Sequence, residues 1–271
     1  MNQTNPEKGL FANIRELFHK SLSAKLSNYR YCSKTTALAL ASGKLKRPDL
    51  DVLVEEMWKQ IVTNWVENGC QWNGKENWRW KLCTHLDEEE NKSNEVRLNR
   101  KLARAFPSDR CSNETPTGSG LASEGGCEPG GLDFALYTPP DRVTMIELKN
   151  PRDKNTNENP VSAAFQIVCY GFFLKLAQLT HARLIHKDGP ISIDNKWKNA
   201  RHADLRVLAP TSFYERYRTL KWFEDSLCKS LGLWSSNRQN ITMTFRFRCF
   251  DKEPTDELQL EAALERDVNW L

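Results

Sequence analysis

Apolar residues recur at intervals of three and four along several parts of the chain, which is the spacing of a helix that buries one face. The clearest stripe spans residues 50–67 and is followed by Asn68 and Gly69, residue types that commonly end a helix. This stripe consists of Leu50, Leu53, Val54, Met57, Trp58, Ile61, Val62 and Trp65. The same spacing predicts helices over residues 10–26, 37–41, 95–106, 161–179 and 212–231 and after Pro254. The sequence therefore predicts a protein rich in helices.

Alternation with a period of two and short apolar runs predict strands between these helices. The strands are expected over residues 130–137, 143–149, 182–186, 205–209 and 241–250, the last of them at an edge of the sheet. On the second strand, Val143 and Met145 share a face with Glu147 and Lys149. Two charges therefore interrupt a strand that otherwise has the pattern of a buried one. Burial of such charges is costly unless they pair with each other or bind a metal.

Two polar segments separate these elements. Residues 108–131 are rich in Ser, Thr, Gly, Pro and Glu, which predicts a long loop with at most one short strand near Leu121. Residues 150–160 have no periodicity and predict a second polar loop.

Helices come first, and strands mixed with helices follow. This order predicts an α/β fold with an N-terminal helical region over residues 1–90 and a second domain over residues 91–271.

Composition adds bounds to this picture. The chain has 271 residues, of which 39% are hydrophobic and 27% are charged, as in globular proteins. The net charge of +4 permits an anionic partner but does not argue for one. The N-terminus lacks the basic and apolar parts of a secretory signal. The apolar run from Ile167 to Leu174 stops at Lys175, short of the ~20 residues that a membrane crossing requires. We therefore predict a cytoplasmic protein with no membrane partner.

Tryptophan and basic residues are interleaved over residues 72–81. The residues are Trp72, Trp78 and Trp80 with Lys75, Arg79 and Lys81. Aromatic side chains beside basic ones can stack on bases and hold phosphates. The same tryptophans can instead seal the contact between the N-terminal helices and the domain that follows.

The candidate chemistry centres on Asp133, Glu147 and Lys149, which a strand, a turn and a second strand carry toward a common point. Carboxylates are the ligands that Mg²⁺ prefers, and a metal so held can polarise a phosphodiester and activate water. We expect a cation beside Lys149 to depress the pKa of its ammonium group. Structural roles remain open. Asp133 can be a charge at the strand edge, and Glu147 and Lys149 can form an ion pair. Glu95, beside the apolar face of its helix, can be a ligand or a favourable charge at a helix N-terminus.

The order of these elements is a helix, a strand with Asp133, a strand ending in Glu-Leu-Lys, a helix and a strand. Over roughly residues 93–190 this order resembles the PD-(D/E)XK nuclease superfamily. The resemblance implies a restriction-endonuclease-like αβββαβ core. The site residues that it implies are Asp133 and Glu147 as ligands of Mg²⁺ or Mn²⁺, Glu95 as a conditional further ligand, and Lys149 as the cation that positions the attacking water. Leu132 stands where that family often has a proline.

A further pair, Gln166 and Tyr170, lies four residues apart on the helix predicted over residues 161–179. A Gln-x-x-x-Tyr pair at this place resembles the RecB-type branch of the superfamily, in which it contacts the nucleic acid or braces the site. A polar patch on a packed helix is the other interpretation.

The resemblance implies a metal-dependent nuclease that hydrolyses the phosphodiester bonds of nucleic acid, with DNA as substrate, in a setting of prokaryotic anti-phage defence or DNA repair. The chain has no Gly-x-x-x-x-Gly-Lys phosphate loop. Energy-driven movement along DNA would therefore require a protein partner such as a helicase or an ATPase. The alternative is a catalytically silent module with a nuclease-like fold that binds nucleic acid or a protein.

Overall fold

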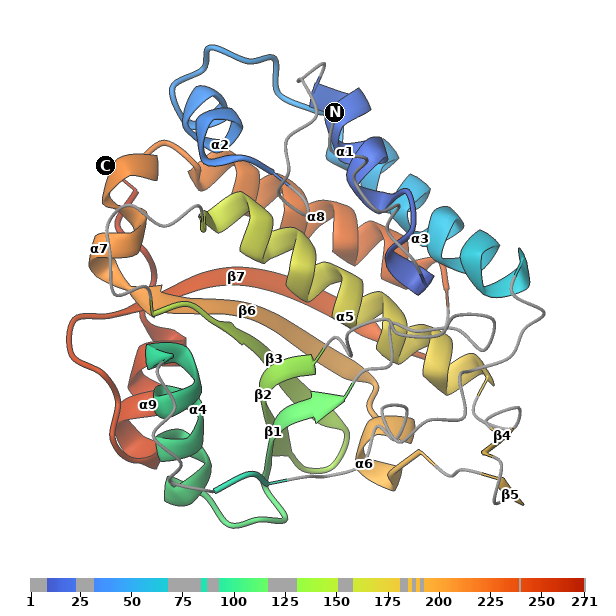
Figure 1. The fold of residues 1–271 in the computed structure, drawn as a ribbon, viewed down its shortest axis with the longest axis vertical. Coiled ribbons are helices and arrows are strands. Elements are labelled where there is room, and N and C mark those ends of the chain that lie inside the picture. Colours follow the sequence, from blue (N-terminus) through green and yellow to red (C-terminus); the bar gives the residue numbers. More distant parts are fainter. Residues whose placement is uncertain are drawn as a thin grey trace, which may run out of the picture.

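A five-stranded mixed sheet forms the centre of the protein in a computed structural model (Figure 1). The structure describes residues 9–22, 32–67, 84–86, 93–116, 131–150, 158–180, 185–186, 189–190, 193–238 and 240–270. The strands, in spatial order, are β1 (Cys111–Pro116), β2 (Gly131–Thr138), β3 (Arg142–Leu148), β6 (His202–Pro210) and β7 (Thr242–Phe250). The pairs β1–β2 and β2–β3 are antiparallel, whereas β3–β6 and β6–β7 are parallel. The fold is therefore α/β, as the sequence predicts.

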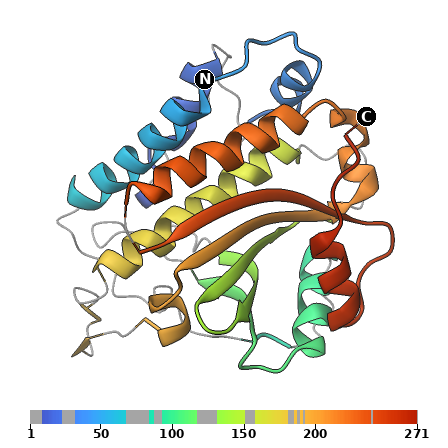
Figure 2. The ribbon, with the colours of Figure 1, turned by 180° about the vertical axis from the view of Figure 1, so that it is seen from behind.

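Helices cover the two faces of this sheet unequally (Figures 1 and 2). On one face, α5 (Pro160–Thr180) and α8 (Lys221–Ser236) pack on the strands, and α3 (Leu50–Glu67) packs on both of them. The helices α1 (Ile14–Leu22) and α2 (Lys34–Ala41) and the 3₁₀ turn η1 (Gly9–Phe11) complete this side. On the other face lie only α4 (Asn94–Ala105) and α9 (Glu257–Glu265) among the longer described helices.

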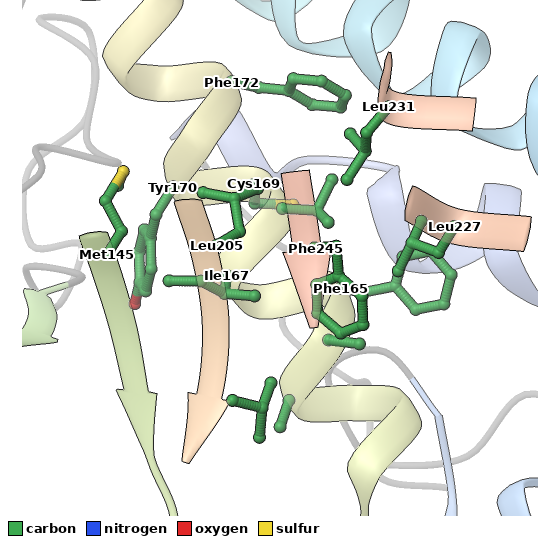
Figure 3. Close-up of a cluster of buried hydrophobic side chains, with 14 of the residues drawn as sticks. Met145, Phe165, Ile167, Cys169, Tyr170, Phe172, Leu205, Leu227, Leu231 and Phe245 are labelled. Carbon is green, nitrogen blue, oxygen red and sulfur yellow. The ribbon is translucent and has the colours of Figure 1, made fainter. Parts of the chain in front are cut away.

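The sheet separates two hydrophobic clusters because its central strands are apolar on both faces. Val143 and Met145 of β3 belong to the larger cluster, under α5, whereas Ile146 and Leu148 belong to the smaller one, under α4 and α9. The alternation expected on this strand is thus confirmed. Figure 3 shows part of the larger cluster, with side chains of α5 between strand residues such as Leu205 and side chains of α8.

The central helix α5 is apolar almost all round, which is the pattern of a helix buried on every side. By length and composition its 21 residues could cross a membrane, so the argument from the short run before Lys175 was wrong. Protein covers 89% of its most apolar stretch. The sheet, α3 and α8 thus cover the apolar surface of α5.

Several predicted elements are confirmed to within a residue or two. The predicted helices 50–67, 95–106 and 161–179 correspond to α3, α4 and α5. The tail after Pro254 forms α9, and β7 is an edge strand as expected. Helices α1 to α3 make up the described part of the N-terminal region and join the cluster under α5 and α8. The division of the chain near residue 90 stays a prediction, and residues 72–81 lie outside the described residues.

Residues 108–131, predicted as a loop, begin with the strand β1, so that prediction was wrong in part. The predicted strand near Leu121 lies outside the described residues. The sequence of β1 has no apolar alternation, so the hydrophobic pattern did not reveal this strand. Its buried residues Ser112, Asn113 and Thr115 are polar, and hydrogen bonds satisfy them. Ser112 and Thr115 pair through their hydroxyls at 2.7 Å, and Asn113 exchanges two hydrogen bonds with the backbone of His85.

Two predictions after α5 are confirmed only in part. Of the strand expected over residues 182–186, the described part is β4 (Ile185–His186). It pairs with β5 (Gly189–Pro190) in a separate two-stranded sheet. The strand that returns beside β3 is β6, after the short α6 (Asn195–Lys198). The single helix expected over residues 212–231 is divided. The pieces are α7 (Thr211–Tyr214), η4 (Glu215–Tyr217) and α8.

We predict that a side chain added at Gly171 of α5 destabilises the protein. A Cβ there would lie 3.0 Å from Cδ1 of Leu205 and 3.4 Å from Sδ of Met243, so the side chains packed between helix and sheet must shift. Gly171→Val should lower the free energy of unfolding by about 1–3 kcal/mol in urea denaturation. The control is Gly232→Val in α8, where nothing lies within 4 Å of the added Cβ and a change of at most about 0.5 kcal/mol is expected. Equal effects at the two glycines would contradict the close packing.

Candidate active site

The charged residues of β3 lie at its C-terminal end. Glu147 is fully buried and Lys149 is 8% exposed. The backbone N–H of Lys149 donates to the carbonyl oxygen of Leu208 at 2.9 Å, which continues the pairing of β3 with β6 past the last strand residue. The main chain is thus fixed up to the residue that carries the ammonium group.

Asp133 reaches the same point from β2. The pairing of β2 with β3 runs to Phe134 opposite Ile146, so Asp133 comes next, at the level of Glu147. At this level a side chain replaces the backbone acceptor: Oδ2 of Asp133 accepts the backbone N–H of Leu148 at 2.8 Å. The carbonyl oxygen of Asp133 accepts a hydrogen bond from Nδ2 of Asn99 on α4 at 2.7 Å, which connects the strand to the helix.

Glu95 is brought into the site by α4. Leu98 and Leu102 anchor this helix in the smaller hydrophobic cluster, and Glu95 in its first turn extends toward the end of β3. Oε1 of Glu95 accepts the backbone N–H of Asn150 at 3.3 Å, and Oε2 lies 3.8 Å from Nζ of Lys149. The structure therefore brings together all four residues that the sequence proposed as catalytic.

Lys149 lies at the centre of these carboxylates. Its Nζ is 2.7 Å from Oε1 of Glu147 and 3.8 Å from Oε2 of Glu95. Burial acts to lower the pKa of Lys149, but Glu147, Asp133 and Glu95 together raise it well above its usual value. This direction is opposite to the one expected from the sequence. The expectation assumed a metal as the dominant neighbour, whereas carboxylates surround the ammonium group.

The carboxyl groups of Asp133 and Glu147 have pKa values that are shifted toward their protonated forms. Burial raises the pKa of Asp133 to about 6, and Glu95 adds to this effect while Lys149 and the N–H of Leu148 oppose it. Burial and the neighbouring Asp133 raise the pKa of Glu147 well above its usual value. The site thus holds more carboxyl groups than its single ammonium group can neutralise, an arrangement typical of functional sites.

The site's carboxylate oxygens are chemically suited to bind a divalent cation, but their positions do not form a complete metal site. In the described structure the donor beside the Glu147 carboxylate is Nζ of Lys149, 2.7 Å from Oε1, whereas Oε2 of Glu147 has no hydrogen-bond partner. A buried carboxylate oxygen left without a hydrogen bond is a natural ligand for Mg²⁺. Among the residues that the structure describes, no three Asp, Glu, His or Cys side chains converge closely enough to hold a metal as they stand. Lys149 reaches in between Glu147 and Glu95.

Gln166 and Tyr170 lie on the face of α5 that covers the sheet. Nε2 of Gln166 donates to the hydroxyl of Tyr170 at 3.4 Å, and Tyr170 is 1% exposed beside Met145 of β3 (Figure 3). Because α5 runs antiparallel to β3, Gln166 lies one turn closer to the end of β3 that carries Glu147. The burial of Tyr170 favours a brace for the site over direct contact with nucleic acid.

Sequence reasoning missed Glu158, which lies in the segment 150–160 taken only as a polar loop. Its side chain is half-buried and hydrogen-bonded to Glu95. Burial raises its pKa to about 7, with Glu95 adding and Lys149 opposing. Asn159 fixes this position, since its Oδ1 accepts the N–H of Ser162 in the first turn of α5 at 2.9 Å. An Asn immediately before a predicted helix is a capping signal, and it could have located the residue beside it.

Glu114 of β1 is a second residue that the sequence did not indicate. Its φ of 48° lies in the left-handed region, and the pairing of β1 with β2 skips it at the level of Asp133. Its Oε1 lies 3.0 Å from Nε of Arg100 on α4. Strained backbone conformations are concentrated at functional sites, and this one lies beside the carboxylate of Asp133.

The chain matches no protein-family model, no curated protein and no solved structure.

We predict that the site makes stability fall as the pH rises toward neutrality when no divalent cation is present. The pKa of Asp133 is about 6 against an ordinary 3.8, so the folded protein retains a proton that the unfolded chain has lost. This stabilisation is complete below about pH 4 and is lost as the pH rises through about 6, and Glu158 extends the interval to about 7.

Urea denaturation in EDTA between about pH 4 and pH 8 measures this effect. Relative to the wild type, Asp133→Asn should unfold at higher urea concentration at the alkaline end of this range and should show a weaker dependence on pH. The control is Glu253→Gln, an exposed carboxylate that contacts Asn150 from outside the cluster. If Asp133→Asn has the same pH dependence as the control, the raised pKa is contradicted.

Proposed function

We propose that the protein is a divalent-metal-dependent nuclease that hydrolyses phosphodiester bonds of DNA. The observation that carries the proposal is the convergence of Glu95, Asp133, Glu147 and Lys149 from one helix and two strands at the end of β3. Three carboxylates and one lysine at one end of a buried strand have no evident structural use, because a simple ion pair needs only one of each.

The order of the elements supports a restriction-endonuclease-like αβββαβ core. The helix α4 precedes the antiparallel strands β1, β2 and β3, and α5 then crosses to β6, which is parallel to β3. The order of the site residues along these elements is the one that the resemblance implies, with Glu95 on α4, Asp133 on β2 and Glu147 on β3. Lys149 directly follows β3, and Gln166 and Tyr170 lie on α5. DNA as substrate, a setting in anti-phage defence or repair, and a helicase or ATPase partner depend on the resemblance alone.

The chain's own residues have distinct roles in the proposed reaction. A bound Mg²⁺ or Mn²⁺ would supply Lewis-acid activation of the water and stabilise charge on the phosphate, with Asp133, Glu147 and Glu95 as the residues that would hold it. Lys149 retains its proton because the surrounding carboxylates raise its pKa, so it acts as a charged donor and not as a base. It orients the water and the scissile phosphate. The N–H of Leu148 fixes the direction of the Asp133 carboxylate.

A catalytically silent module that binds nucleic acid or a protein is the second candidate. The observation that favours it is the 2.7 Å contact between Lys149 and Glu147, which neutralises one carboxylate without a metal. Incubation of the protein with circular duplex, linear duplex and single-stranded DNA and with RNA, in Mg²⁺, Mn²⁺ or EDTA, separates the two candidates. Cleavage that needs the metal supports the nuclease. Binding without cleavage of any substrate supports the silent module.

We predict that Lys149→Ala lowers the rate of metal-dependent DNA cleavage by about 10²–10³-fold, because it removes a positioned charge beside the reacting phosphate. The measurement is single-turnover cleavage of labelled DNA. The control is Lys101→Ala, which removes an exposed lysine from α4 and should leave the rate unchanged. Wild-type rates in Lys149→Ala, or cleavage that survives EDTA, would rule out the mechanism.

We predict that Glu95→Gln weakens Mn²⁺ binding by about tenfold or more, because it removes a carboxylate that lies beside Lys149 and Glu158. Isothermal titration with Mn²⁺ measures the affinity directly and needs no substrate. Glu253→Gln serves as the control here too. Unchanged affinity in Glu95→Gln would confine the metal ligands to Asp133 and Glu147 and assign Glu95 to the start of the helix.

A further inference from the structure

The sheet face that carries α4 and α9 is divided into an apolar half and a polar half. Near the C-terminal ends of the parallel strands this face is apolar and lies under the two helices (Figure 1). Toward the ends at which these strands begin, the side chains that β3, β6 and β7 place on this face are polar. The polar residues are Arg142 and Thr144 of β3, His202, Asp204 and Arg206 of β6, and Thr242, Thr244 and Arg246 of β7. None of the longer described helices covers this polar half.

Asp204 holds two of the arginines in place across three neighbouring strands. Its Oδ2 accepts a hydrogen bond from Nη1 of Arg142 at 2.6 Å, and its Oδ1 lies 3.3 Å from Nη2 of Arg206. The hydroxyl of Thr244 donates to Oδ1 at 2.6 Å and accepts from Nη1 of Arg206 at 3.1 Å. The carboxylate therefore fixes the position of guanidinium groups that would otherwise be flexible.

The arginines outnumber the acids that face them. Arg206 and Arg246 are paired in register on adjacent strands, and like charges at such positions repel each other. Burial, Arg248 and Arg246 all act to lower the pKa of Arg206, and Asp204 opposes them. The acid nearest to Arg246 is Asp225, at 3.9 Å and half exposed. A fold does not need this repulsion, whereas an anion bound across the pair would relieve it.

The guanidinium groups also retain donors for an outside partner. Arg142 is 45% exposed and Arg246 is 34% exposed in their side chains. Of the described contacts, the one to Asp204 engages a single nitrogen of Arg142, and those of Arg246 engage only Nη1. Threonine hydroxyls lie beside them, and Arg together with Thr is typical of contacts to phosphate oxygens.

The partner is better matched by phosphates than by a protein surface. Protein interfaces are centred on buried aromatic and apolar residues. None of the exposed large apolar side chains of the described residues belongs to these strands; they are Val52, Val66, Leu86, Leu179, Leu233 and Leu258. A polar face with several guanidinium groups and no apolar anchor suits a chain of phosphates.

We propose that the polar face formed by Arg142, Arg206 and Arg246 binds the phosphate backbone of a nucleic acid. The choice of nucleic acid as partner rests on the proposed function. Arg142 and Lys149 lie at opposite ends of β3, so these contacts are made with phosphates remote from the bond that is cut. The face adds affinity without selecting a sequence, because phosphate contacts carry no base information.

Binding in EDTA tests this surface without cleavage. The measurement is fluorescence anisotropy of a labelled DNA duplex and of a labelled single strand over a range of salt concentrations. The variants are Arg142→Gln, Arg246→Gln and the two combined, at one exposed and one half-buried position. The control is Arg218→Gln, an exposed arginine after η4 on the other side of the sheet, which changes the net charge equally.

We expect the double variant to bind at least tenfold more weakly and the slope of log affinity against log salt to fall by about one for each arginine lost. The control should match the wild type. The surface is ruled out if the double variant keeps the affinity and salt slope of the control. It is also ruled out if no nucleic acid binds the wild type, or if polyglutamate competes equally with DNA for the arginines.

The outcome is separable from that of the proposed nuclease. Cleavage by the wild type with unchanged DNA binding in the double variant overturns the surface and leaves the nuclease standing. DNA binding that depends on the arginines, without cleavage, supports the phosphate-binding face and rules out the proposed nuclease.

Discussion

The buried ion pair of Glu147 and Lys149 is the constraint around which this end of the protein is built. Charges removed from water are tolerated only when their partners are held close and in a fixed geometry. Here the partners come from separate elements. The pairing with β6 fixes Lys149, the N–H of Leu148 fixes Asp133, and α4 delivers Glu95. An error in the packing of any one of these elements would leave a carboxylate without compensation in a nonpolar environment.

The two hydrophobic clusters explain how such a site is supported. Each of the site's main elements is anchored in one or both of them. α5 lies in the larger cluster, α4 in the smaller one, and β3 contributes to both because its faces alternate. The site therefore lies where the two clusters approach the same end of β3. The polar half of the sheet lies at the other end, where the smaller cluster stops.

Sequence reasoning succeeded where a residue's environment is local. The apolar stripes predicted α3, α4 and α5, and alternation on β3 grouped Glu147 and Lys149 on the face of Met145. It failed where burial depends on hydrogen bonds between distant segments. Strand β1 is buried by polar groups that bond to one another and to residue 85, which no hydrophobic pattern reveals. Glu158 escaped notice for a similar reason, since only the folded chain brings it to Glu95. The division of the predicted helix 212–231 into α7, η4 and α8 depends on tertiary packing as well.

The pairing of α4 with α9 has a consequence for the order in which the site can form during synthesis. Figures 1 and 2 show the two helices side by side, and Leu98 and Leu102 of α4 share their cluster with Leu260 and Leu264 of α9. Arg110, just after α4, also pairs with Glu257. The helix that carries Glu95 thus acquires part of its packing from residues translated more than 150 positions later. A ribosome-bound chain that has not yet released α9 holds Asp133, Glu147 and Lys149 but lacks the full support for Glu95. The packing of the helix that carries Glu95 is therefore complete only after translation has passed residue 265.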